Sequence, residues 1–275
     1  MKNQPYIHGE TITRIPPLGS YLPIVQTGVV ENWLASNLTP SDWILCPFGS
    51  SPQAALEAAR AGYRVLMPIH NPILRFLVKK SADPPLEKDL NTSLVQLASS
   101  YKGKERLKPH LLSLYETDCP HCGQRTTAAA FIWDKSTREP VSKICRCSAC
   151  GEESNAEITE SDLKKALAFS DQSPTHARAL TRVTTPTDPI RIQVENALAT
   201  YPPRSVYALF TALNKVTGFN LPAGERANLE ILLLHAFYLC SQTLGQSAQE
   251  EDEDSTEHGT FREENVWLAM EDALE

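Results

Sequence analysis

No apolar run in this chain is long enough to cross a lipid bilayer, which takes about 20 residues. The longest run, Leu229 to Cys240, is interrupted by Glu230 and His235. The amino terminus has no apolar segment of the kind that marks a signal peptide. We therefore expect a cytoplasmic protein that has no membrane among its partners.

Signatures of several enzyme classes are missing as well. The sequence contains no P-loop, no nucleophile elbow and no residue set with the spacing of a catalytic metal site. Its 275 residues are 41% hydrophobic and 21% charged, which is enough for one large or two modest domains. No catalytic residue can therefore be assigned from these motifs.

Basic charge is also scarce, because the formal net charge is −7. Residues 250–275 contain eleven acidic side chains and one basic one, a net charge of −10, which leaves +3 for residues 1–249. Net charge therefore attracts nucleic acid only weakly. A local basic patch is possible in KGKERLKPH, with Lys102, Lys104, Arg106 and Lys108, but a solvated loop is the commoner meaning of such a run.

Seven cysteines are present, and four of them have the spacing of metal ligands. CPHCG begins at Cys119, CSACG begins at Cys147, and 24 residues lie between Cys122 and Cys147. Two thiolates with two residues between them can face one ion, and the following glycine lets the backbone fold back. Four thiolates in a tetrahedron select zinc or, less often, iron. We predict a structural zinc site formed by Cys119, Cys122, Cys147 and Cys150.

The residues between the two motifs, 124–146, predict a β-hairpin, which is the scaffold of a zinc ribbon. Cys145 alternates like a strand residue, so we interpret Cys145, Cys46 and Cys240 as free structural thiols. His121 is expected to face solvent. A closed four-thiolate site contributes folding energy and takes no part in catalysis.

The segment from Asp42 to Pro72, DWILCPFGSSPQAALEAARAGYRVLMPIHNP, predicts a strand, a glycine turn, a helix and a second strand. This order is typical of a parallel strand pair with a crossover helix. Backbone N–H groups at such a turn and at the start of the following helix can bind the carboxylate of a ligand. In this sequence the N–H groups would be those of Gly49, Ser50 and Ser51.

Together these segments resemble the N-terminal half of prokaryotic DNA amino-methyltransferases (adenine-N6 or cytosine-N4) that carry an inserted zinc ribbon. The similarity covers nearly the whole chain through IPPLGSYLPIVQTGVVENWL, CPFGSSP, VLMPIHNP, DCPHCG, YPPRSVYALFTAL and FREENVWLAMEDALE. It implies a partial Rossmann-like sheet, DNA as a partner and S-adenosylmethionine as a cofactor. The implied cofactor contacts are Pro47, Phe48, Gly49, Ser50, Ser51 and Asn71.

The sequence departs from that family at three positions of the site. Cys46 replaces the acidic residue that opens the family's D-P-F-x-G-S-G turn, and Ile69 stands where an acidic residue would bind the ribose. The family's catalytic (D/N/S)-P-P-(Y/F/W) loop is matched only by DPPL, Asp83 to Leu86, whose leucine cannot stack on an extruded base. A proline-marked helix junction is the commoner meaning of DPPL.

Three functions remain open. The chain is part of a split or truncated S-adenosylmethionine-dependent DNA methyltransferase, inactive alone and completed by a second polypeptide; the apolar C-terminal helix motivates this hypothesis, since it needs something to bury it. Alternatively, the chain is a catalytically dead relative that acts as a zinc-ribbon module binding nucleic acid or protein. The third hypothesis is a methyltransferase that acts alone on another substrate.

The predicted organisation is α/β with an inserted ribbon and a helical C-terminal segment. Thr159 and Asp162 predict a capped helix start. YPPRS, at Tyr201 to Ser205, is most simply a helix start, although Arg204 could instead face phosphates. The predicted ranges are 1–115 for the methyltransferase-like cofactor subdomain, 116–158 for the ribbon, 159–247 for a helical segment, 248–260 for an acidic disordered loop and 261–275 for a C-terminal helix.

Overall fold

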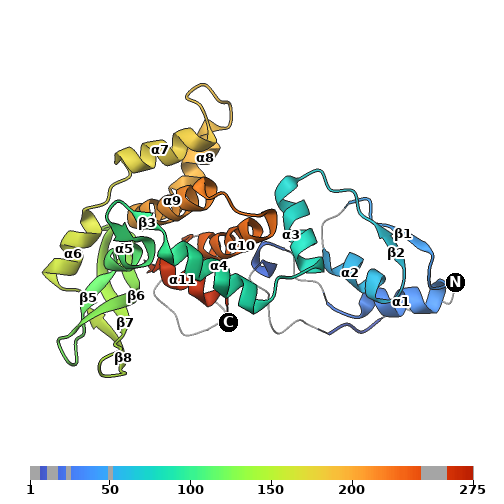
Figure 1. Ribbon diagram of the computed structural model, residues 1–275, viewed down its shortest axis with the longest axis horizontal. Coiled ribbons are helices and arrows are strands. Elements are labelled where there is room, and N and C mark those ends of the chain that lie inside the picture. Colours follow the sequence, from blue (N-terminus) through green and yellow to red (C-terminus); the bar gives the residue numbers. More distant parts are fainter. Residues whose placement is uncertain (1–6, 11–17, 23–25, 49–51, 243–258, 275) are drawn as a thin grey trace. The chain divides into compact units, whose positions relative to one another are not determined.

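The computed structural model describes residues 7–10, 18–22, 26–48, 52–242 and 259–274 (Figure 1). The chain divides into two compact units, Met1–Leu86 and Glu87–Glu275. The division lies within the range 1–115 that the sequence predicts as one cofactor subdomain. Most of the predicted acidic loop, 248–260, lies outside the described residues.

The first unit is built on a short parallel strand pair. β1 (Trp43–Leu45) pairs with β2 (Arg64–Leu66), and α2 (Pro52–Arg60) makes the crossover between them. This confirms the predicted order and direction of these elements. The described part of the unit adds no third strand to the pair, so a Rossmann-like sheet stays a prediction. The unit also contains η1 (Gly19–Tyr21), α1 (Val29–Asn37) and α3 (Pro72–Ala82).

A buried carboxylate joins the two helices that cover one face of this strand pair. Glu57 of α2 accepts hydrogen bonds from the backbone N–H groups of Gly28, at 3.0 Å, and Val30, at 3.2 Å. These N–H groups belong to the first turn of α1, where no backbone acceptor is available. Leu34, Ala58 and Tyr63 form the small apolar core beside them.

The second unit combines a helical bundle with two sheets. Its helices are α4 (Glu87–Ser99), α5 (Leu107–Ser113), α6 (Glu160–Leu167), α7 (Pro174–Val183), α8 (Arg191–Leu198), α9 (Pro203–Gly218), α10 (Ala223–Leu239) and α11 (Val266–Asp272). Its strands are β3 (Tyr101–Lys102), β4 (Glu105–Arg106), β5 (Glu116–Asp118), β6 (Arg125–Asp134), β7 (Glu139–Arg146), β8 (Glu153–Glu157) and β9 (Thr260–Glu264).

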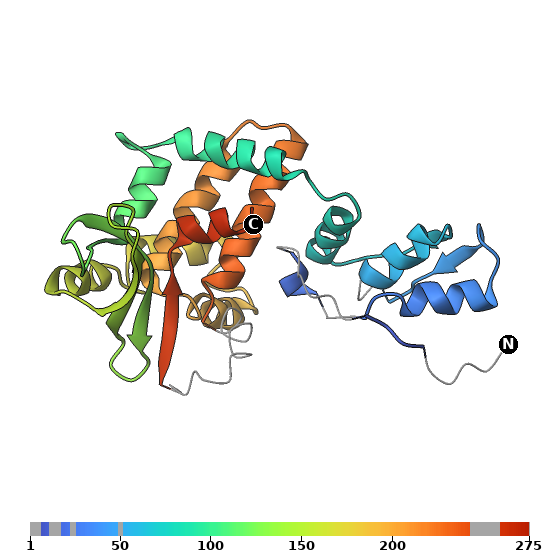
Figure 2. The same ribbon diagram turned by 90° about the horizontal axis from the view of Figure 1, so that it is seen from below.

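The larger sheet is organised around β6. The hairpin β6–β7 confirms the prediction for residues 124–146, and β8 pairs with the outer edge of β7. The other edge of β6 is shared: β5 pairs with its first residues, and β9 pairs with its second half. Figure 2 shows β9, in red, alongside the ribbon strands. The ribbon is therefore one sheet with a strand that the sequence predicts as part of the C-terminal helix.

The apolar residues of the C-terminal helix are covered within the second unit. Val266, Trp267 and Met270 of α11 are buried, and α11 packs against α10. Asn265 caps the helix by accepting the N–H groups of Trp267 and Leu268, and its Nδ2 donates to the Ala128 carbonyl. The sequence suggests that these apolar residues need something to bury them. The chain itself buries them.

Candidate metal centre

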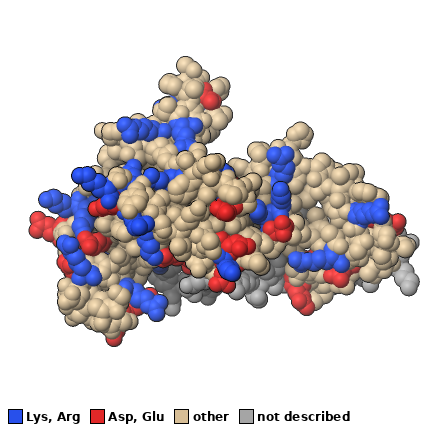
Figure 3. Space-filling view, in the orientation of Figure 1, with Lys and Arg blue, Asp and Glu red and all other residues tan. Residues whose placement is uncertain are grey.

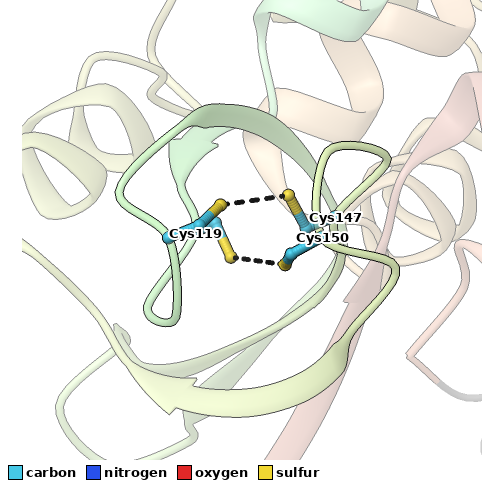
Figure 4. Close-up of side chains that lie close together, drawn as sticks. Cys119, Cys147 and Cys150 are labelled. Atoms are coloured by element: carbon cyan, nitrogen blue, oxygen red, sulfur yellow. Dashed lines mark hydrogen bonds between the residues drawn. The ribbon is translucent and has the colours of Figure 1, made fainter.

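Both cysteine motifs lie at one end of the ribbon sheet. The first joins β5 to β6, and the second joins β7 to β8. Because β5 and β8 flank the central hairpin, the two turns face each other across the end of the sheet (Figure 4). The predicted ligands Cys119, Cys122, Cys147 and Cys150 are therefore brought together by the strands on either side of them.

The four sulfur atoms are spaced like the ligands of one tetrahedral ion. The Sγ atoms of Cys119 and Cys150 are 3.8 Å apart, and those of Cys122 and Cys147 are 3.7 Å apart. All four lie within 4.8 Å of one another. Zinc binds thiolate at about 2.3 Å, so four sulfurs around a tetrahedral zinc ion lie about 3.8 Å from each other. The donor set and its spacing fit zinc.

The two turns have the same backbone structure. In the first, the N–H of Cys119 donates to the carbonyl of Gln124, and the N–H of Gly123 donates back to the carbonyl of Cys119. Cys147, Gly151 and Glu152 repeat this pattern in the second turn. Gly123 and Gly151 have φ angles of 70° and 77°, the left-handed region that glycine occupies without strain. The glycine after each motif is thus required by the turn.

Backbone amides within the second turn favour a thiolate at its first cysteine. The N–H groups of Cys150 and Ala149 lower the pKa of Cys147 to about 6. At Cys150 the N–H of Glu152 lowers the pKa, but desolvation and the neighbouring thiols outweigh it and raise the pKa to about 12. A cation among the four sulfurs would favour the thiolate at every position, so metal binding is coupled to proton release.

A polar network centred on the buried side chains of Lys143 and Asp162 supports the strand before the first turn. Lys143 of β7 donates to Thr117 Oγ1 at 2.6 Å, to the Asp118 carbonyl at 3.3 Å and to Asp162 Oδ2 at 2.8 Å. Asp162 also accepts the N–H of Thr159, which completes the predicted capping box at the start of α6. Lys143 therefore fixes the strand that leads directly into Cys119. The sequence places this lysine on a strand but carries no signal that it is buried.

The remaining cysteines and His121 do not join the cluster. Cys145 is buried and its Sγ lies 3.5 Å from Ser154 Oγ, while Cys46 and Cys240 are free thiols elsewhere in the chain. His121 is exposed. An ion held by all four sulfurs would have a complete tetrahedral shell and no open position for a substrate, as in structural sites.

The predicted cofactor contacts lie around the end of β1 and the start of α3. Pro47 and Phe48 follow β1 and are exposed, Phe48 by 90%. Gly49, Ser50 and Ser51 lie outside the described residues. Asn71 caps α3, where its Oδ1 accepts the N–H groups of Ile73 at 2.9 Å and Leu74 at 3.2 Å. The side-chain oxygen of Asn71 is therefore already used by the helix.

Two other candidates have structural roles. DPPL joins α3 to α4, Asp83 is the C-cap of α3, and Leu86 is 69% exposed, which agrees with a helix junction. Arg204 is buried at the start of α9 and is paired with Glu263, so it does not face phosphates.

Comparisons with protein-family models, with curated proteins and with solved structures found no match. No helix in the described part of the chain has the length and hydropathy needed to span a membrane.

Proposed function

We propose that this chain is the cofactor-domain and zinc-ribbon part of an S-adenosylmethionine-dependent DNA methyltransferase, and that it works with a catalytic loop supplied by residues outside this sequence. The observation that carries the proposal is the parallel β1–α2–β2 unit. Open α/β sheets bind nucleotide-like ligands beyond the carboxyl ends of their strands, and residues 46–51 form the connection at that end of β1. The resemblance places the cofactor turn at the same residues.

The surroundings of this connection support a weak cofactor site. The exposed ring of Phe48 is free to pack on an adenine. Helix starts are common binding sites for carboxylates such as that of the methionine moiety, and α2 begins at Pro52, directly after this connection. Among the described residues, Cys46 occupies the position of the family's anchoring carboxylate, and the carboxylate of Glu57 is committed to the amides of α1.

The C-terminal segment supports the same proposal. In the family that the chain resembles, the catalytic loop follows a segment like ENVWLAMEDALE. Here that segment is held to the ribbon, since β9 pairs with β6 and Asn265 is bonded to Ala128 and Ala129. The zinc ribbon would thus serve as the anchor for the residues that precede the catalytic loop.

Isothermal titration of the whole, zinc-loaded chain with S-adenosylmethionine tests the proposal. We expect one binding site per chain, and Phe48→Ala should weaken it severalfold. Leu86→Ala is the matched control, because Leu86 is also an exposed apolar residue of the first unit. A flat titration with a folded first unit would remove the proposal.

A second candidate is a zinc-ribbon module that binds nucleic acid or protein without a cofactor. It is favoured by the closed four-thiolate cluster, whose outer cysteines Cys122 and Cys150 lie in exposed turns, and by the absence of acidic residues at positions 46 and 69. Mobility-shift binding that disappears in Cys147→Ser, together with no heat on addition of S-adenosylmethionine, would favour this candidate over the first.

A further inference from the structure

The small hairpin β3–β4 has two different faces. Tyr101 pairs with Arg106 and Lys102 pairs with Glu105, so the two pairs point to opposite sides. Gly103 makes the turn with a φ of 64°, and Lys104 lies beside it. All six residues from 101 to 106 are exposed.

The Lys102 and Glu105 face holds the hairpin against the helices. The Lys102 ammonium lies 5.9 Å from the centre of the Tyr207 ring on α9. Glu105 Oε2 lies 3.4 Å from Nδ1 of His110 on α5, and Nε2 of the same histidine lies 3.0 Å from the Tyr207 hydroxyl. Glu105 is therefore engaged by a histidine, and it is the only acidic residue within the hairpin.

The Tyr101 and Arg106 face is open. Tyr101 is 55% exposed, and the Arg106 guanidinium lies 5.2 Å from the centre of its ring. Arg106 is itself anchored, because its Nη1 donates to the carbonyl of Ser99 at 2.9 Å. Figure 3 shows Lys and Arg side chains on the molecular face that carries α5 and β3, with Asp and Glu side chains among them. The result is an exposed aromatic ring held beside the Arg106 guanidinium, with Lys104 in the adjoining turn.

We propose that this face of the β3–β4 hairpin binds single-stranded nucleic acid, with a base stacked on Tyr101 and phosphates contacted by Lys104 and Arg106. An exposed aromatic ring beside cations is how proteins hold unpaired strands, because every base offers a face for stacking. A duplex keeps its bases stacked on one another and would leave the ring unused. The choice of DNA as the polymer rests on the proposed function.

Fluorescence anisotropy with the whole, zinc-loaded chain tests the inference, using a labelled oligothymidylate and a labelled duplex of equal length. We expect tighter binding of the single strand. Tyr101→Leu should weaken it about tenfold, because stacking of one base contributes about 1–3 kcal/mol. Lys104→Gln should reduce the slope of log K against log salt by about 0.7, the change expected for one phosphate contact.

The matched control is Lys135→Gln, which removes one exposed charge elsewhere in the second unit and should leave the affinity within about twofold. Equal or tighter binding of the duplex would overturn the inference, as would a Tyr101→Leu variant that binds normally. Displacement of the strand by polyglutamate at equal charge would instead assign the face to an acidic protein.

Single-strand binding and cofactor binding can fail separately. A chain that binds the single strand but takes no S-adenosylmethionine would leave the inference standing while the proposed function fails. A chain that binds the cofactor but no single strand would leave the proposed function standing while the inference fails.

Discussion

Arg204 of α9 and Glu263 of β9 form a bidentate ion pair, and their side chains are 1% and 0% exposed. Nε and Nη2 of the arginine lie 2.9 and 2.5 Å from the two carboxylate oxygens. The guanidinium also lies 4.6 Å from the centre of the Tyr115 ring and 4.5 Å from that of the Phe131 ring, and Trp133 Nε1 donates to the carboxylate. The pair ties the helical bundle to the ribbon sheet.

Removing the carboxylate of Glu263 should destabilise the second unit strongly. Glu263→Ala leaves the Arg204 guanidinium buried without its counter-charge, which costs about 3–5 kcal/mol. Chemical denaturation measures this loss. Glu153→Ala, at an exposed position on β8, is the control and should change the free energy of unfolding by less than about 0.5 kcal/mol. Equal midpoints for the two variants would contradict the role given to the pair.

The ion pair between Lys143 and Asp162 should make the free energy of unfolding decrease at acid pH. Burial alone would raise the pKa of Asp162, but hydrogen bonds from Lys143 and the Thr159 amide outweigh it and hold the pKa below its usual value. Since the folded-state pKa is the lower one, the stabilisation is present above about pH 4 and is lost as the pH falls through the folded-state pKa. Asp162→Asn should remove this part of the acid dependence in unfolding measured from pH 7 to pH 2. Asp171→Asn, at an exposed position, is the control and should leave the pH profile unchanged. An unchanged profile for Asp162→Asn would contradict the role given to the ion pair.

Two cysteines separated by one residue should behave differently toward metal. Cys147→Ser removes a ligand, so we expect loss of bound zinc and loss of cooperative unfolding in the ribbon. Cys145→Ser is the matched control: its sulfur contacts Ser154 outside the cluster, and its zinc content should stay at one ion per chain. Metal analysis after gel filtration distinguishes them. A Cys145→Ser protein that loses its metal would contradict the assigned ligand set.

The carboxylate of Glu57 should protect the first turn of α1. Glu57→Gln weakens the acceptor for the Gly28 and Val30 amides and should cost about 1–2 kcal/mol, as losses of helix caps do. Hydrogen exchange at those two amides should accelerate by about tenfold, while exchange in α4 should not change. Glu31→Gln, an exposed change in the same helix turn, should have a smaller effect. Equal acceleration by both variants would show that charge near the helix end is sufficient.

The parts of the fold that follow local rules could be predicted from the sequence. The two C-x2-C-G motifs set the ligands and their turns, because spacing and the left-handed glycine are local properties. The capping pair Thr159 and Asp162 indicated the start of α6 in the same way. The parallel pairing of β1 with β2 followed from the strand-helix-strand order.

The parts that depend on distant contacts could not be predicted. β9 is a strand because it completes the edge of β6, about 130 residues earlier, and its sequence continues without a break into the apolar pattern of α11. The buried state of Lys143 and Arg204 depends on acidic partners 19 and 59 residues away. The start of α7 differs from these cases, because its signal is local: Ser173 caps the helix and Pro174 occupies its first turn. It could have been predicted from the sequence.

X-ray absorption at the zinc edge of the purified whole chain tests the central claim most directly. Four sulfur neighbours at about 2.3 Å, with one zinc ion per chain, are expected if Cys119, Cys122, Cys147 and Cys150 hold a structural ion. A first shell that contains nitrogen or oxygen, or a folded chain that binds no zinc, would contradict it.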